Sequence, residues 1–101
     1  MDPERSSDIS ISDVVISTAG RDQGKLFYVI GTDPVYLSLA NGKDRTLDKP
    51  KLKKRRHIEM VLRSETRVAE KLRLGDKVLN SELRKDLAYL SREEECNATG
   101  G

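Results

Sequence analysis

A dense run of cations is the feature of this sequence best suited to bind a ligand. Between residues 51 and 56, five of six side chains are basic, and only Leu52 interrupts them. Lys and Arg side chains donate hydrogen bonds and stay charged at neutral pH, so the run attracts phosphates and other anions. Because successive side chains of an extended chain point to opposite sides, these cations cannot all face one phosphate strand. We expect them to straddle a groove or to line an arm inserted into a folded polyanion.

The charge of the chain is concentrated around this run. The net charge of the whole protein is only +2, but residues 43–57 hold eight Lys or Arg against two Asp, a net charge of +6. Residues 1–42 carry three basic and six acidic side chains, and residues 58–101 carry eight and nine. One block therefore supplies the whole positive excess, which predicts a local attraction for polyanions.

Two other interpretations of the run stay open. A charge run is usually a solvated loop without a ligand, and in a eukaryotic host a basic segment of this kind can be a nuclear localisation signal. The density of the run favours phosphate binding. Contacts of that kind supply affinity and sensitivity to salt, but little sequence information.

Length and composition indicate one small domain. The chain has 101 residues, 36% of them hydrophobic and 36% charged, which suits a single compact core. No apolar run approaches the roughly 18 residues of a membrane span, and the first twelve residues lack the apolar region of a signal peptide. The single cysteine, Cys96, cannot form an internal disulfide, which suits a reducing compartment. We expect a cytoplasmic protein that has no membrane partner and is monomeric when free.

The inventory of reactive side chains argues against an enzyme. One His and one Cys near the C-terminus provide no Cys–His pair on rigid elements and no metal-ligand cluster. The sequence has no P-loop, and residues 20–24 lack the glycine pattern of a dinucleotide site. We therefore expect no catalysis, no metal, no cofactor and no small-molecule substrate.

Alternating and β-rich segments predict the first part of a sheet. Residues 13–17, 25–30 and 35–39 are rich in Val, Ile, Leu and aromatic side chains and are separated by glycine-containing turns. Tyr28 and Tyr36 fall on neighbouring strands. They could stack on unpaired bases, but we favour packing on the barrel because the chain has few aromatic residues.

The second part of the sheet is predicted from turn signals. Asn41-Gly42 is a strong hairpin signal, so we expect the chain to return through residues 43–47. Pro50 ends regular pairing, the basic run follows, and residues 57–61 form a last strand. About five short, tightly turned strands favour a small barrel, which removes exposed sheet edges.

After the predicted barrel, apolar residues recur at helical spacing and no longer alternate, which predicts two helices. The first lies between Ser64, a candidate N-cap, and Gly75, a helix stop, and the second begins near residue 80. Apolar side chains recur at helical spacing: Val68, Ala69 and Leu72 in the first, and Leu79, Leu83, Leu87 and Leu90 as one stripe along the second. We expect the stripe to complete the core. The expected organisation is a flexible lead-in (1–11), a barrel (12–62), a helical extension packed on it (63–92) and a disordered tail (93–101).

Part of the barrel segment resembles a known motif. The segments DVVIS (13–17), GRD (20–22) and GK (24–25), with Val29, resemble the KOW motif of several ribosomal proteins and of the transcription elongation factor NusG. The resemblance implies an SH3-like barrel in which the motif spans two strands and their loop. Residues 41–58 narrow the match to the KOW-domain RNA-binding proteins of Gram-positive bacteria. These are similar to a family of large-subunit ribosomal proteins of archaea and eukaryotes.

This resemblance implies ribosomal or other structured RNA as the ligand. The expected RNA-binding side chains are Arg21, Lys25, Lys43, Arg45, Lys49, Lys51, Lys53, Lys54, Arg55, Arg56 and His57. We expect His57 to be a minor contributor. Gly20 and Gly24 would let the backbone approach RNA closely or would only permit positive φ, and we favour the structural role. The alternatives are a NusG-like adaptor for polymerase or ribosomal proteins and a factor associated with DNA.

Overall fold

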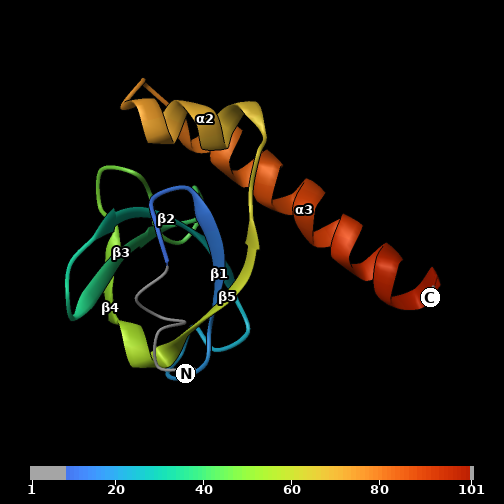
Figure 1. The fold of residues 1–101 in the computed structure, drawn as a ribbon, viewed down its shortest axis with the longest axis horizontal. Coiled ribbons are helices and arrows are strands. Elements are labelled where there is room, and N and C mark those ends of the chain that lie inside the picture. Colours follow the sequence, from blue (N-terminus) through green and yellow to red (C-terminus); the bar gives the residue numbers. More distant parts are fainter. Residues whose placement is uncertain (1–8, 101) are drawn as a thin grey trace.

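The computed structural model describes residues 9–100 and confirms a fold of five strands followed by two helices (Figure 1). The strands are β1 (Asp13–Ser17), β2 (Leu26–Thr32), β3 (Tyr36–Ala40), β4 (Lys51–Lys54) and β5 (Ile58–Arg63). A 3-10 turn, η1 (Arg55–His57), joins the last two strands, and the helices α2 (Arg67–Leu74) and α3 (Asn80–Gly100) follow. The chain is thus mostly β with a helical C-terminal part.

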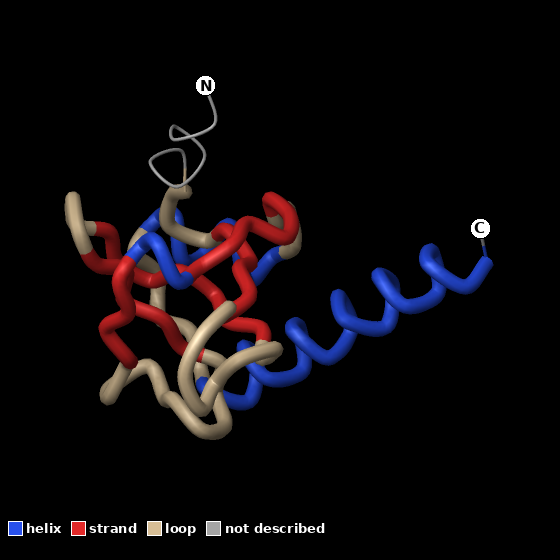
Figure 2. The backbone as a smooth tube through the Cα atoms, turned by 90° about the horizontal axis from the view of Figure 1, so that it is seen from below, coloured by secondary structure: helices blue, strands red, loops and turns tan. Residues whose placement is uncertain are grey.

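The five strands form one antiparallel sheet in the order β4-β3-β2-β1-β5. The sheet curls as in an SH3-like barrel but is not closed, because β4 and β5 are its two edges. The chain crosses from one edge to the other through η1. Figure 2, which shows the molecule of Figure 1 from below, shows that α3 projects away from the barrel.

Both faces of the central strands are buried, which explains why their sequences are almost continuously apolar. On β2, Phe27 and Val29 pack inside the barrel with Val15, whereas Tyr28 faces the opposite way and packs with Val14. The interior cluster consists of Ile9, Val15, Phe27, Val29, Leu37, Leu39 and Ile58, and the outer cluster consists of Val14, Tyr28, Ala40, Ala69, Leu83 and Leu87. The second cluster is the contact between the sheet and the helices.

The two helices pack on the sheet through apolar side chains that their helical spacing predicted. Thr66 caps α2 by accepting a hydrogen bond from the amide of Ala69 at 3.2 Å, and Gly75 ends it in the left-handed conformation. Leu83 and Leu87 are buried on α3, whereas Leu79 is 53% exposed just before the helix begins. Burial of one such leucine contributes about 1.5–3 kcal/mol, so the helices are part of the core.

A buried polar network joins β2 to both helices. The hydroxyl of Tyr28 donates to the carboxylate of Asp86 on α3 and lies 2.7 Å from the hydroxyl of Ser64. The hydroxyl of Thr66 donates to the same carboxylate at 2.8 Å. Burial, together with the hydrogen bond to Asp86, raises the pKa of Tyr28 to about 12. Ser64, our candidate N-cap, is occupied by this network, and Thr66 caps α2 in its place.

The predicted return strand at residues 43–47 is wrong. The partner of β3 is β4, part of the basic run that we placed in an irregular arm, and residues 41–50 form a long connection. The carbonyl of Arg45 accepts hydrogen bonds from the amides of Asn41 and Gly42, so the chain turns tightly there without starting a ladder. A Cβ atom on Gly42 would lie 2.2 Å from the carbonyl oxygen of Asn80. Gly42 therefore allows the connection to contact α3, in addition to adopting a positive φ.

The two ends of the chain differ from the expected boundaries. Most of the predicted flexible lead-in (1–11) lies outside the described residues, but Ile9 is buried in the barrel interior. At the other end, α3 continues to Gly100, through the segment (93–101) for which we expected a disordered tail. Residue 101 lies outside the described residues.

Candidate nucleic-acid interface

The basic run is divided by its register against β3. Lys51 pairs with Leu39, and Lys53 pairs with Leu37. Directly paired residues share one face of a sheet, and both leucines are buried in the barrel interior. Lys51 and Lys53 therefore point toward the inside of the barrel at its β4 edge. Inward-pointing charges are one way in which a sheet edge avoids pairing with other chains.

Asp22 compensates these two inward cations. Its Oδ2 atom lies 2.9 Å from Nζ of Lys51 and 3.6 Å from Nζ of Lys53, and the side chains of Asp22 and Lys53 are only 9% and 10% exposed. Nζ of Lys53 also donates to the carbonyl of Ala19 at 2.7 Å. We call Asp22, Lys51 and Lys53 the Asp22 cluster; it joins the loop between β1 and β2 to the β4 edge.

The electrostatics of the Asp22 cluster leave a positive excess. The Lys51 ammonium lowers the pKa of the Asp22 carboxyl below 3.8; burial opposes this shift, and Lys53 and Arg45 add to it. One carboxylate faces two ammonium groups, so the cluster keeps one uncompensated positive charge while its side chains are held in place.

The outer face of the same strand presents its side chains to solvent. Tyr36 pairs with Lys54, and Ser38 pairs with Leu52, which places these residues on the face opposite to the Asp22 cluster. Lys54 is exposed, Leu52 is 63% exposed and Tyr36 is 38% exposed. Of the two tyrosines considered above, Tyr28 is buried, as we favoured. For Tyr36, base stacking stays the alternative to the packing that we favoured.

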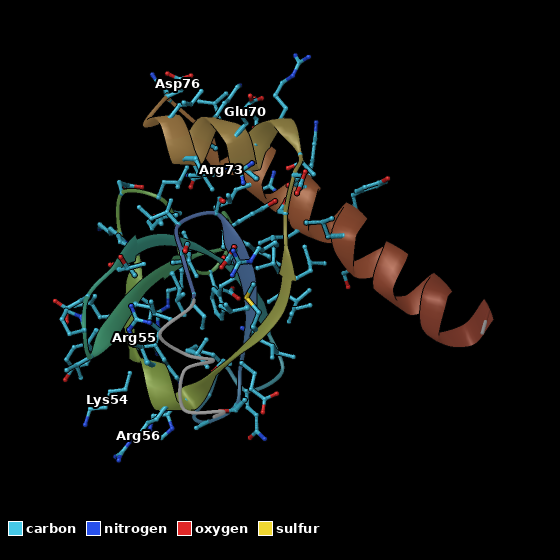
Figure 3. All side chains as sticks on the ribbon, viewed as in Figure 1. Lys54, Arg55, Arg56, Glu70, Arg73 and Asp76 are labelled. Atoms are coloured by element: carbon cyan, nitrogen blue, oxygen red, sulfur yellow. The ribbon has the colours of Figure 1, made fainter. Side chains whose placement is uncertain are left out.

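Lys54 and Arg56 are the exposed cations of the run. Neither forms an ion pair with any side chain of residues 9–91, the side chains that the structure describes, and both lie at the end of the barrel opposite α2 (Figure 3). Lys49 is also exposed, just before β4. These side chains can move toward a phosphate without giving up a partner.

Arg55 and His57 have structural contacts in the turn. The Nε atom of Arg55 donates to the carbonyl of Asp33 at 2.7 Å, and the carbonyl of His57 accepts a hydrogen bond from the amide of Thr18 at 2.9 Å. Both side chains are half-buried. The turn η1 is therefore held against the neighbouring loops, and its exposed member is Arg56.

The loop between β1 and β2 has the geometry that its glycines predicted. Gly20 and Gly24 have φ values of +80° and +89°, which favour glycine at both positions. A Cβ atom on Gly20 would lie 3.1 Å from Nζ of Lys53, whereas one on Gly24 would meet nothing within 4 Å. Gly20 thus leaves room for the Asp22 cluster. Arg21 is exposed on the same loop.

Further cations lie around the 41–45 connection. Lys25 forms an exposed ion pair of 2.7 Å with Asp44, and the hydrogen bond from Lys25 lowers the pKa of that carboxyl. Lys43 is exposed, and Arg45 is half-buried beside the Asp22 cluster. The structure therefore separates the predicted set into exposed side chains and held side chains.

Sequence reasoning missed two charged residues of this surface. It considered Asp22 only as a loop residue, because no local pattern links it to cations about thirty positions away. It also missed Arg84 of α3, whose guanidinium donates to the carbonyl of Gly42 at 3.4 Å. Both contacts are long-range, and only the folded chain brings the partners together.

Comparison of the sequence with protein-family models and with curated proteins finds no match. Among the side chains that the structure describes, no group of three or more His, Cys, Asp or Glu is placed to hold a metal ion. Within the same part of the chain, no helix combines the length and the apolar character needed to cross a membrane.

Proposed function

We propose that this protein is a cytoplasmic, non-catalytic RNA-binding protein of the KOW type, and that its ligand is ribosomal RNA or an intermediate of ribosome assembly. The observation that carries the proposal is the exposure of Lys54 and Arg56 on the edge strand and η1, where no described acidic residue pairs with them. The KOW-like segments of β1, β2 and their loop support the choice of RNA.

Binding would use the exposed members of the predicted set. These are Arg21, Lys25, Lys43, Lys49, Lys54 and Arg56. Each would contact phosphate oxygens and thereby fix the orientation of the RNA, without reading its sequence. Shape recognition would come from the loop at residues 18–25, whose backbone is open at Gly24.

The inward lysines would have a different role. Lys51 and Lys53 hold the loop against β4 through Asp22, so they would shape the surface that RNA meets. Their residual positive charge would still add to the attraction at longer range.

Crosslinking in the cells that make the protein, followed by sequencing of the attached RNA, tests this proposal. We expect ribosomal RNA to be enriched at discrete positions. A spread over messenger RNAs would overturn the ribosomal assignment, and recovery no greater than that of an uncrosslinked control would overturn RNA binding altogether.

A protein-interaction adaptor is the second candidate, and the outer face of the β4 edge favours it. Leu52 and Tyr36 of this face are 63% and 38% exposed, and β4 pairs on one side only. An extended segment of a partner protein could add to such an edge. Partners captured from lysate would persist after ribonuclease treatment if the adaptor role is correct, and would be lost if they are held through RNA.

A further inference from the structure

A hollow lies between the barrel and α3, where Lys25 and Lys43 of the predicted set meet residues of α3 that the sequence did not place in the site. It has a volume of about 340 Å³. The barrel contributes the end of the 18–25 loop, the start of β2 and the 41–44 connection, and α3 contributes residues from Arg84 to Ser91. The hollow is shallow and open to solvent, so it can hold part of a ligand against the surface but cannot enclose one.

The rim of the hollow is positively charged. Lys25, Lys43 and Arg84 line it together with one carboxylate, that of Asp44. Asp44 is paired with Lys25, so Lys43 and Arg84 have no acidic partner among the described side chains, those of residues 9–91. The excess of two positive charges suits a phosphate group, to which an Arg guanidinium can donate two hydrogen bonds.

Part of the hollow is apolar. Leu26 of β2 and Ala88 of α3 line it, whereas Leu87 adds little surface because it is only 6% exposed in the core between sheet and helix. An apolar surface beside charged side chains matches a nucleotide, in which a flat base is joined to a phosphate. A bare phosphate would make no use of the apolar part, and a paired base would not be free to reach it.

We propose that this hollow receives one unpaired nucleotide of the bound RNA, with its phosphate against Lys43 and Arg84 and its base on Leu26 and Ala88. This inference rests on the proposed RNA-binding function and extends it to a ligand class: RNA with a single-stranded segment beside the site of phosphate contact. It also makes α3 part of the interface, in addition to its role in the core.

Two variants and a matched control test the inference. Fluorescence anisotropy would compare a labelled single-stranded oligoribonucleotide with a blunt duplex of the same sequence. Arg84→Gln removes one charge from the rim, and Lys85→Gln removes one charge from the neighbouring exposed position on α3, which does not line the hollow. Ala88→Leu fills the hollow without changing charge and keeps a good helix former.

We expect Arg84→Gln to weaken single-strand binding about fivefold or more and Lys85→Gln to weaken it less than about twofold, because only the first loses a directed contact. Ala88→Leu should weaken single-strand binding to a similar extent and leave duplex binding unchanged. Equal effects of Arg84→Gln and Lys85→Gln, or single-strand binding by Ala88→Leu as tight as wild type, would overturn the inference while RNA binding stands. Failure of the wild-type protein to bind either RNA would overturn the proposed function as well.

Discussion

Two pairs of cations in one short run have opposite environments. Lys51 and Lys53 point into the barrel edge and are held by a nearly buried carboxylate. Lys54 and Arg56, in the same run, are exposed and form no ion pair with a described residue. The difference follows from strand alternation and from the turn after β4, and does not depend on residue type.

This contrast separates charge that stabilises the fold from charge that is available to a ligand. A buried ion pair is expensive to break, because the remaining charge is left without a partner. An exposed cation contributes little to stability but can exchange water for phosphate. Variants at the two pairs should therefore change different properties of the protein.

The largest effect is expected when the carboxylate of the Asp22 cluster is removed. Asp22→Asn leaves the inward ammonium of Lys53 without its compensating charge and should lower the free energy of unfolding by about 2 kcal/mol. Urea unfolding followed by circular dichroism measures this change. The control is Asp76→Asn, at an exposed position beyond α2, which should change stability by less than about 0.5 kcal/mol. Equal stability of the two variants would show that the inward lysines need no partner.

The next effect is on binding, at the exposed pair. The double variant Lys54→Gln and Arg56→Gln should weaken RNA binding about tenfold near 0.1 M salt, because two phosphate contacts are lost. Its free energy of unfolding should stay within about 0.5 kcal/mol of the wild-type value.

The matched control removes the same charge from the opposite end of the molecule. Arg67→Gln with Arg73→Gln changes two exposed positions on α2, far from Lys54 and Arg56 in Figure 3. This variant should weaken binding much less. If both double variants lose affinity equally, RNA responds to net charge alone, and the surface proposed here has no special role.

The smallest expected effect is a dependence of the free energy of unfolding on pH. Because the folded protein lowers the pKa of Asp22 below 3.8, the stabilisation is complete above that value and is lost as the pH falls through the folded-state pKa. The difference in stability between wild type and Asp22→Asn should be constant from pH 7 to pH 5 and should shrink below pH 4. A difference as large at pH 3 as at pH 7 would exclude ionisation of Asp22 as its source.

Local pattern predicted most of the elements. The first three strands, the last strand and both helices were expected near their observed positions, because β-rich runs and leucines at helical spacing are local signals. The fourth strand was missed, since the sequence of β4 has one apolar residue among three lysines and resembles a solvated loop. The hairpin predicted at Asn41-Gly42 was wrong. Gly42 lies in a turn, but it also allows the chain to approach α3 closely, so the pair does not connect two strands.

The composition of the sequence predicted which residues belong to the candidate site, and the fold separates them into exposed and inward-pointing side chains. The sequence identified which residues are basic, but the inward direction of Lys51 and Lys53 depends on their register with Leu39 and Leu37. Their partner, Asp22, lies far away in the chain. Arg84 joins the surface through the packing of α3 on the barrel; the leucine stripe predicted this packing, but no local signal predicted the contact of Arg84 with Gly42.

The dependence of RNA affinity on salt tests the central claim most directly. If four to six of the exposed cations contact phosphates, the logarithm of the association constant should fall against the logarithm of salt concentration with a slope of about −3 to −5. The measurement is an anisotropy titration of wild-type protein with structured ribosomal RNA between about 50 and 300 mM salt. A slope near that range agrees with phosphate binding by exposed side chains. A slope near zero, or no binding at the lowest salt, contradicts it.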